Sequence, residues 1–215
     1  MAHVWAIVVA GGSGQRFGQL KQYAVLRDRP VLAWAVEACG RAASGVVLVV
    51  PRGSDPNAHR DHGATVIVEG GETRAESVRN GLAAVPFEAD VIIVHDAARP
   101  LASDFLFSAV VQAVAHEGVG AAVPGIPVTD TIKVVDAAHT VTSTLDRTAL
   151  VAVQTPQAFS AELLRRAHAE HGEATDDATL VEALGATVRV VPGDPRNLKI
   201  TTPADLRTAE HLLGD

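Results

Sequence analysis

The sequence is poor in cysteine and lysine, and each shortage excludes a class of protein. Among 215 residues there is one cysteine, Cys39, so neither a disulfide framework nor a cysteine-ligated zinc site can form within one chain. Lysine occurs only as Lys21, Lys133 and Lys199, and no run rich in lysine or arginine is present. Because the formal net charge is also −7, we expect no nucleic-acid partner, which would require a basic face.

Long apolar runs are missing as well. The run nearest the N-terminus, Trp5–Ala10, has the length of a strand and is too short for a membrane span or a signal-peptide core. We therefore expect no membrane partner and a cytoplasmic location. The composition, with 47% hydrophobic and 20% charged residues, is that of a globular protein with a sizeable core.

Short β-branched runs alternate with amphipathic stretches along the chain. The predicted strands are Val4–Val9, Val46–Val50, Ala64–Val68, Val91–Val94, Gly120–Val123 and Thr187–Val191. The predicted helices are Val31–Arg41, Arg74–Val85, Asp104–His116, Ala161–His171, Asp176–Leu184 and Pro203–Leu213. Nearly all-apolar strands are typical of strands covered on both faces. The pattern therefore predicts an α/β three-layer sandwich with a mainly parallel sheet, whose ligands bind beyond the carboxyl ends of the strands.

One segment departs from this alternation. Two threonine- and valine-rich runs, Asp130–Val135 and Thr140–Leu145, predict a β-hairpin arm at about residues 130–147. An isolated hairpin is barely stable in water, so the arm should pack either on a second subunit or back on its own domain. Since there is no repeat and no long linker, residues 1–215 are expected to form a single domain.

The first predicted strand runs into a glycine-rich loop, Ala10–Gly18. Glycine lets the backbone approach a ligand closely, and its N–H groups can cradle phosphate oxygens. The loop is neither a P-loop, which ends in Gly-Lys-Ser/Thr, nor a dinucleotide fingerprint, because Phe17 stands where the third glycine is needed. With Arg16 and Lys21 close by, the loop suits a triphosphate; the alternative is a plain strand–helix turn.

A second loop, His95–Pro100, directly follows the strand Val91–Val94. Its carboxylate, Asp96, is placed to hold Mg²⁺ against phosphates, and Arg99 can form a bidentate pair with another phosphate. The alternative is an Asp–Arg pair that only fixes the loop. His95 itself is better explained as a packed or hydrogen-bonded histidine.

Three further segments carry weaker signals. Gly70–Arg74, which leads into Ser77, could accept a base or ribose, or could be only a capped helix start. Lys199, before the last helix, suits a phosphoryl oxygen, although a lone lysine is usually solvated. Thr175–Asp177 looks like a metal site, but Thr175 as a helix cap with acids in the first turn explains it more simply.

Together these segments resemble one family, the 2-C-methyl-D-erythritol 4-phosphate cytidylyltransferases of the non-mevalonate isoprenoid pathway. The resemblance runs from the glycine-rich loop to Thr202–Leu206 and so covers nearly the whole chain. In chain order its landmarks are Gly12–Arg16, Lys21–Tyr23, Arg74 with Ser77, His95–Pro100, Asp130-Thr131, Asp146-Arg147, Gln154–Gln157, Thr175–Asp177 and Asn197–Thr201. Each landmark is weak alone, whereas their order and spacing are highly specific.

The resemblance implies a Rossmann-like nucleotidyltransferase fold and a magnesium-dependent transferase. Its substrates would be CTP and 2-C-methyl-D-erythritol 4-phosphate, and its products 4-diphosphocytidyl-2-C-methyl-D-erythritol and pyrophosphate. One alternative is a ribitol-5-phosphate cytidylyltransferase with the same fold and reaction. A second is a non-catalytic, nucleotide-binding regulatory module.

The resemblance also implies a role for individual residues. The catalytic cations that stabilise charge on the α-phosphate would be Arg16, Lys21 and Lys199. The nucleotide would contact Ala10, Gly11, Gly12, Gly71, Glu72, Ser77, Asp96 and Ala97, and Asp96 would also touch the metal ion. The acceptor would be held by Arg99, Thr131, Arg147 and Thr155. Family members are homodimers that exchange their arms, so Thr131 and Arg147 would serve the neighbouring subunit's site.

The chemistry agrees with this set of residues. A phosphate monoester is mostly a dianion at neutral pH, since its second pKa is about 6, and it needs no general base to act as a nucleophile. The loops offer cations and backbone donors but no serine or cysteine paired with a histidine. We therefore predict direct displacement at the α-phosphorus without a covalent enzyme intermediate.

Overall fold

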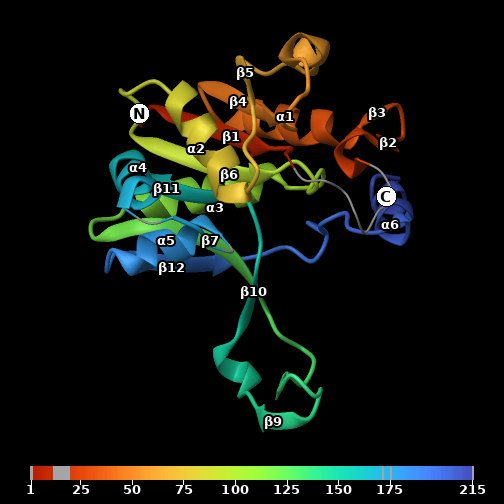
Figure 1. Ribbon diagram of the computed structural model, residues 1–215, viewed down its shortest axis with the longest axis vertical. Coiled ribbons are helices and arrows are strands. Elements are labelled where there is room, and N and C mark those ends of the chain that lie inside the picture. The colour runs from red at the N-terminus through yellow and green to blue at the C-terminus, as the bar shows by residue number, and fades with distance from the viewer. Residues whose placement is uncertain (1, 12–19, 171, 175, 215) are drawn as a thin grey trace.

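The centre of the computed structural model, which describes residues 2–11, 20–170, 172–174 and 176–214, is an eight-stranded sheet (Figure 1). Its strand order is β10-β7-β11-β6-β1-β4-β5, and β12 also pairs with β7. The strands are β1 (Val4–Val9), β4 (Gly45–Val50), β5 (Val66–Glu69), β6 (Val91–Asp96), β7 (Val119–Pro127), β10 (Val151–Val153), β11 (Gln157–Ser160) and β12 (Thr187–Pro192). Only β10 and β11 run antiparallel to their neighbours, so the prediction of a mainly parallel sheet is confirmed.

Helices cover both faces of the sheet. On one face lie α1 (Val31–Ala42) and α3 (Asp104–Val114); on the other lie α2 (Arg74–Ala84), α4 (Ala161–Glu170) and α5 (Asp177–Ala183). The alternation of side chains along a strand explains the two cores. In β1, Val4, Ala6 and Val8 pack with α1 and α3, whereas Trp5 and Ile7 pack with α2 and α4. The predicted three-layer sandwich is therefore confirmed.

Two strand predictions need correction. Thr187–Val191 does form a strand, but it is mostly exposed, because β12 lies at an edge of the sheet and only β7 borders it. The sequence analysis also missed two strands of this sheet, β10 at its edge and β11, which inserts antiparallel between β6 and β7. The four residues of β11, Gln-Ala-Phe-Ser, form no β-branched run, so nothing in their pattern marks a strand.

A smaller core joins the C-terminal helix to the site. In this core α6 (Pro203–Leu212) packs beside the two-stranded pair β2 (Val25–Leu26) and β3 (Arg29–Pro30). The helix begins with a capping box, in which the Thr202 hydroxyl accepts from the Asp205 N–H and the Asp205 carboxylate accepts from the Thr202 N–H at 2.7 Å. This cap fixes the end of the loop that carries Lys199.

Replacing Thr202 with alanine should lower the free energy of unfolding by about 1 kcal/mol, because the helix loses its N-cap. Thr208→Ala, a change within the same helix, is the matched control. The Thr208 hydroxyl only bonds back to the Ala204 carbonyl, and alanine is the better helix former, so that change should be neutral or slightly stabilising. Urea denaturation of both variants checks this expectation, and equal losses would show that the cap is not the cause.

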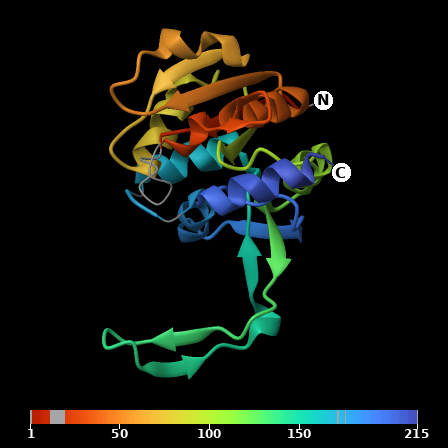
Figure 2. The ribbon, with the colours of Figure 1, turned by 90° about the vertical axis from the view of Figure 1, so that its right-hand side faces the viewer.

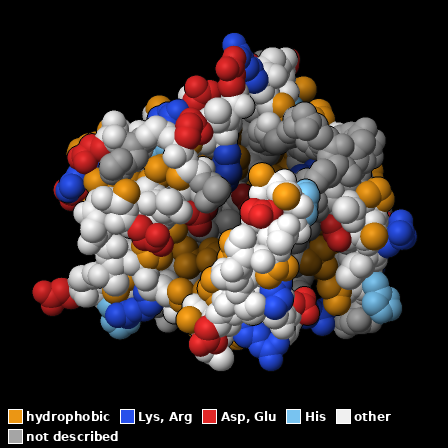
Figure 3. All heavy atoms as spheres, turned by 60° about the horizontal axis from the view of Figure 1, so that its bottom comes forward, with side chains coloured by type: hydrophobic (Ala, Val, Ile, Leu, Met, Phe, Trp, Pro, Cys, Tyr) orange, Lys and Arg blue, Asp and Glu red, His pale blue; other side chains and the backbone are white. Residues whose placement is uncertain are grey.

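The arm leaves the body of the protein between β7 and β10, as Figures 1 and 2 show. At its tip β8 (Lys133–Val135) pairs antiparallel with β9 (Val141–Thr144), close to the predicted hairpin. Every residue of β8, β9 and β10 is exposed. Figure 3, in which this end of the molecule comes forward, shows hydrophobic side chains open to view. The large hydrophobic residues that are exposed on the arm and on β10 are Val134, Val135, Val141, Leu145, Val151 and Val153.

In the described part of the chain, no helix is both long and apolar enough to cross a membrane. Cys39 is buried in α1.

Candidate active site

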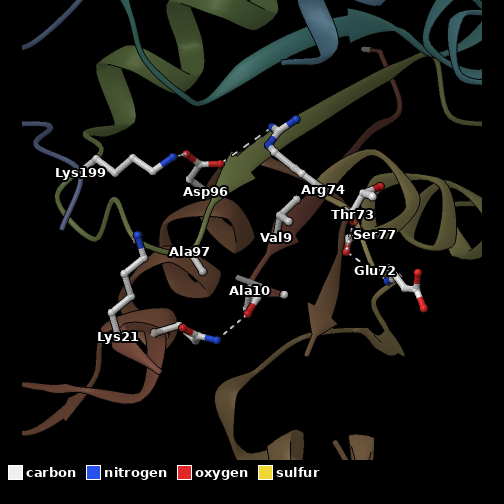
Figure 4. A pocket seen from close by; sticks show the side chains of 14 residues that line it. Val9, Ala10, Lys21, Glu72, Thr73, Arg74, Ser77, Asp96, Ala97 and Lys199 are labelled. Carbon is white, nitrogen blue, oxygen red and sulfur yellow. Dashed lines mark hydrogen bonds and ion pairs between the residues drawn. The ribbon is translucent and has the colours of Figure 1, made fainter. Parts of the chain in front are cut away.

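A cavity of about 270 Å³ opens at the edge of the sheet where β1, β5 and β6 end (Figure 4). Its lining comes from segments that are far apart in the sequence. These residues are Val9, Ala10, Gly11, Lys21, Gln22, Gly71, Glu72, Thr73, Arg74, Ser77, Asp96, Ala97, Ala98 and Lys199. This is the edge at which a parallel α/β sheet binds its ligands.

The backbone after β1 is held from two sides. The Ala10 N–H donates to the Val49 carbonyl at 2.8 Å, and the Ala10 carbonyl accepts a hydrogen bond from the Gln22 side-chain amide at 2.7 Å. Gln22 is 2% exposed, so this contact is a buried one that fixes the backbone of Ala10, where the glycine-rich loop begins. Of the predicted residues of this loop, Gly12 and Arg16 lie outside the residues that the structure describes.

The Ser77 hydroxyl ties the next loop to the start of α2. It donates to the Thr73 carbonyl at 2.9 Å and accepts from the Gly71 N–H at 3.1 Å. A Cβ atom at Gly71 would lie 2.2 Å from the Cβ of Glu76, so the close approach requires glycine. Gly71, Thr73 and Ser77, together with Glu72, form one wall of the cavity.

Asp96, at the end of β6, is the charged centre of the cavity. Its Oδ2 lies 2.6 Å from the Lys199 Nζ, and its Oδ1 lies 3.9 Å from the Arg74 Nη2. Burial alone would raise the pKa of this carboxyl, but Lys199 and Arg74 outweigh burial and lower the pKa to about 2. Asp96 is therefore an anion at neutral pH. The next residue, Ala97, is buried and forms part of the cavity wall.

Two of the three predicted catalytic cations line this one cavity. Lys21 reaches it from the short 3₁₀ helix Lys21–Tyr23, and Lys199 reaches it from the loop before α6 (Figure 4). The Ile200 N–H donates to the Ala98 carbonyl at 2.8 Å, which fixes the Lys199 loop beside the end of β6. The third cation, Arg16, lies outside the described residues.

Thr155 and His95 form a hydrogen-bonded pair that holds the backbone of Asp96 in place. His95 is fully buried, with Nδ1 3.0 Å from the Thr155 hydroxyl and Nε2 3.1 Å from the Arg99 carbonyl. Burial lowers the pKa of His95 to about 4, so the ring is neutral, as expected for a packed histidine. The Thr155 hydroxyl also accepts from the Asp96 N–H at 3.0 Å. Thr155 thus orients Asp96 and does not itself line the cavity.

Arg99 lies on the same side as Thr155. Its Nη1 donates to the Asn197 carbonyl at 2.7 Å, and the Asn197 side chain, fully buried, donates to the Thr155 carbonyl at 2.9 Å. The Arg99 Nε is buried and has no hydrogen-bond partner within the described part of the chain. These contacts connect the Lys199 loop to the segment that follows the arm.

Thr131 and Arg147 lie on the arm and do not line the cavity of their own chain. Both are exposed, and the Arg147 Nη1 donates to the Thr129 carbonyl at 2.5 Å. One chain alone therefore does not bring them together with Lys199.

In the acidic segment at the start of α5, the first carboxylate, that of Asp176, has a structural role. Asp176 caps the helix, accepting from the Thr179 N–H at 3.0 Å, so the cap is not Thr175, which lies outside the described residues. Asp177 is buried and pairs with Arg74 at 2.8 Å.

The sequence analysis gave no role to Gln22 and named Arg74 only as the end of a segment, Gly70–Arg74, that could accept a base or ribose. Both belong to landmarks of the resemblance, yet neither their type nor their spacing indicates a contact. Arg74 had one available signal. It is a cation at the first position of a predicted helix, where an acidic residue is favoured, and such a departure from local preference is typical of a functional site.

The donor set of the cavity suits a hard divalent cation. Mg²⁺ is usually held by one or two carboxylates together with substrate phosphates, and Asp96 offers one ionised carboxylate at the cavity. Among the described residues, no three His, Cys, Asp or Glu side chains gather as a metal site would require. Phosphate oxygens and water would therefore have to supply the other ligands.

Comparisons with known proteins agree on one family. A family model described as 2-C-methyl-D-erythritol 4-phosphate cytidylyltransferase matches residues 4–215. The protein of that name from Nocardia farcinica is 47% identical over 98% of this chain and 94% of its own length. A "bifunctional enzyme IspD/IspF" from Anaeromyxobacter dehalogenans is 46% identical over 98% of this chain, which spans 57% of that longer protein.

A solved structure supports the same comparison. The crystal structure of 4-diphosphocytidyl-2C-methyl-D-erythritol synthase from Anaerococcus prevotii superposes with a TM-score of 0.85 at 29% identity. The match covers 100% of this chain and 99% of that one, so the arm and the sheet are both part of the shared fold.

Proposed function

The chain belongs to the 2-C-methyl-D-erythritol 4-phosphate cytidylyltransferase family, and from this premise we propose how its cavity carries out the family's reaction. The enzyme transfers CMP from CTP to 2-C-methyl-D-erythritol 4-phosphate and releases pyrophosphate. The observation that carries the proposal is that Lys21, Asp96 and Lys199 line one cavity at the carboxyl edge of the sheet.

The nucleotide enters between the loops that follow β1 and β5. Ala10 and Gly11 approach the phosphates, together with Gly12 of the glycine-rich loop, while Gly71, Glu72 and Ser77 lie against the cytosine and Ala97 lies by the ribose. Gln22 keeps the Ala10 carbonyl in place.

The reaction is a displacement at the α-phosphorus. A bond forms between an acceptor phosphate oxygen and the α-phosphorus, the bond to the bridging oxygen of the β-phosphate breaks, and pyrophosphate leaves with that electron pair. The acceptor is already a dianion, so no proton has to be removed. Lys21, Lys199 and Arg16 stabilise the charge that collects on the α-phosphate, which is the main requirement of phosphoryl-type transfer.

Mg²⁺, or another divalent cation, belongs to the proposal with Asp96 as its protein ligand. Its contribution when bound would be to neutralise phosphate charge and to orient the triphosphate. Repulsion is the obstacle that the site must overcome, since two unit charges 4 Å apart repel by about 4 kcal/mol at an effective dielectric constant of 20. Thr155 and His95 keep Asp96 in position for this role.

The acceptor is proposed to bind between two copies of the chain. Arg99 lies near Asp96 and carries a buried Nε without a partner among the described residues, which suits a phosphate or hydroxyl of the acceptor. Thr131 and Arg147 would come from the arm of the second copy. Thr155 stays in the proposed acceptor set because Asn197 connects it to Arg99. An isolated hairpin is barely stable in water, and exposed apolar side chains often mark a protein–protein interface. The exposed valines of the arm therefore support a homodimer. A cytoplasmic location is also part of the proposal.

We expect pyrophosphate release to require CTP together with 2-C-methyl-D-erythritol 4-phosphate. With that pair kcat/KM should exceed the value for UTP, ATP or GTP, or for ribitol 5-phosphate, by at least about 100-fold, because buried polar groups reject a ligand that leaves them unpaired. A coupled pyrophosphate assay over the full panel, with acceptor-free blanks, measures this.

Each other result of this panel has a defined meaning. Faster turnover of ribitol 5-phosphate would assign the enzyme to that acceptor instead. No release with any pair would favour the regulatory module. An isolated CMP–enzyme adduct would contradict direct displacement.

A further inference from the structure

Arg74 occupies a position where a positive charge is locally unfavourable. It is the first residue of α2, directly after the cap Thr73. The N-terminus of a helix carries a partial positive charge, so a cation there is repelled and an anion is attracted. The chain nevertheless places a guanidinium at this point, on the wall of the cavity.

A buried carboxylate compensates for this charge. The Arg74 Nη1 lies 2.8 Å from Asp177 Oδ2, and the Asp177 side chain is 1% exposed. The other oxygen of Asp177 lies 3.0 Å from Nε2 of His168, which is also buried, on α4. Arginine stays protonated in proteins, so Arg74 is a cation, and the buried Asp177 carboxylate fixes the direction of its guanidinium.

The remaining side of the guanidinium faces the ligand site. The Arg74 side chain is 28% exposed, and its Nη2 lies 3.9 Å from Asp96 Oδ1, which is too far for a hydrogen bond. Figure 4 shows Arg74 between Asp96 and the wall formed by Thr73 and Ser77. It thus lies between the proposed position of the nucleoside and the carboxylate proposed to hold the metal ion.

A purely structural role accounts less well for this arrangement. Arg165 shows what such a role looks like, because it ties α4 to the other end of α2 by donating to the carbonyls of Leu82, Val85 and Pro86. It uses neutral acceptors and needs no buried anion. A buried ion pair is a weak source of stability, since burying both charges removes their hydration. The Arg74–Asp177 pair is better explained by what it presents to the cavity.

We propose that Arg74 is a further phosphate-binding residue for the CTP triphosphate, and that Asp177 and His168 are positioning residues that hold it in place. The planar guanidinium suits bidentate binding of phosphate oxygens. Its place on the cavity wall beside Thr73 and Ser77, which the proposed function gives to the nucleoside, assigns it to the nucleotide and not to the acceptor. This inference rests on the proposed function of the same cavity.

The test compares ligands with and without phosphates on the whole protein. Calorimetry with CTP and NMR titration with cytidine are carried out on the wild type, Arg74→Gln and Arg165→Gln. Arg74→Gln is expected to raise the Kd of CTP about tenfold to 100-fold, the range for a lost hydrogen bond to a charged group. The Kd of cytidine should change by less than about twofold. Arg165→Gln should lower Tm but leave both Kd values unchanged.

Two further variants separate positioning from folding. Asp177→Asn should raise the Kd of CTP about fivefold or more. Arg74→Lys keeps the positive charge but loses the planar guanidinium, so it should give an intermediate Kd for CTP with a native Tm. If Arg74→Gln fails to fold, Arg74→Lys decides the question. In the double variant Arg74→Gln/Asp177→Asn the loss of affinity should equal that of Arg74→Gln alone.

The contrary results are equally specific. An equal loss for CTP and cytidine, or no loss for CTP, would make Arg74 structural. A raised KM for the acceptor with an unchanged Kd for CTP would move Arg74 to the acceptor site. All of these results require an active wild type. A wild type that neither binds CTP nor releases pyrophosphate would instead overturn the proposed function.

Discussion

Lys199→Ala is expected to lower kcat about 10²- to 10³-fold while the Kd of CTP changes less than about threefold. The lysine sits on the loop fixed by the Ile200–Ala98 hydrogen bond, and its Nζ pairs with Asp96 at 2.6 Å. Its charge is needed most when the acceptor phosphate and the α-phosphate are closest, so the loss falls on the transition state and not on nucleotide binding. Single-turnover kinetics and calorimetry with CTP separate the two effects.

Arg196→Ala is the matched control for this change. Arg196 lies in the same loop, but it is exposed and its guanidinium donates to the Leu212 carbonyl on α6, away from the cavity. Its loss should slightly lower Tm and leave kcat within about twofold. Unchanged turnover in Lys199→Ala would remove this residue from the catalytic set, and a loss confined to CTP affinity would make it a binding residue only.

Mixed dimers of Arg147→Ala and Lys199→Ala subunits are expected to recover about a quarter of wild-type activity. Each parent should be about 10²-fold or more impaired, Arg147→Ala through acceptor use with CTP binding retained. If Arg147 acts on the neighbouring site, one site of each mixed dimer carries both defects and the other carries none. Random exchange makes about half of the dimers mixed, so about one site in four is intact.

Subunit exchange followed by the pyrophosphate assay measures this recovery. The same two proteins mixed without exchange provide the baseline, and Lys133→Ala, which changes an exposed arm lysine bonded to the Thr144 hydroxyl, shows the effect of altering the arm elsewhere. No recovery after verified exchange would mean that Arg147 serves the site of its own chain, which would contradict the exchanged arm.

The sheet and helices followed from local patterns. Runs of Val and Ile predicted the parallel strands with boundaries within two residues for β1, β4 and β6, because burial on both faces leaves few polar residues in a strand. Asp96 was likewise predictable, since a carboxylate directly after a buried strand must lie at the ligand edge of the sheet. The positions of Ala10, Gly71 and Lys199 on this cavity agree with the same rule.

Other parts of the site depend on contacts that local patterns do not carry. Thr155 reaches the backbone of Asp96 only because β11 inserts antiparallel between β6 and β7. Gln22 meets the Ala10 carbonyl, and Asp177 meets Arg74 from another helix 103 positions away (177 − 74). Such pairs are set by tertiary packing, so spacing along the chain gives no indication of them.

The way in which the arm leaves the body has a consequence for assembly. The arm begins as a direct continuation of β7, whose first seven residues are buried and bordered by β11 and β12, and it returns through β10 along the same strand. The base of the arm is thus paired within the sheet of its own chain, so the direction in which the arm leaves the body is set when each chain folds. A partner would meet an arm whose direction is already fixed, so the entropy cost of orienting the arm is not left to be met at the encounter itself.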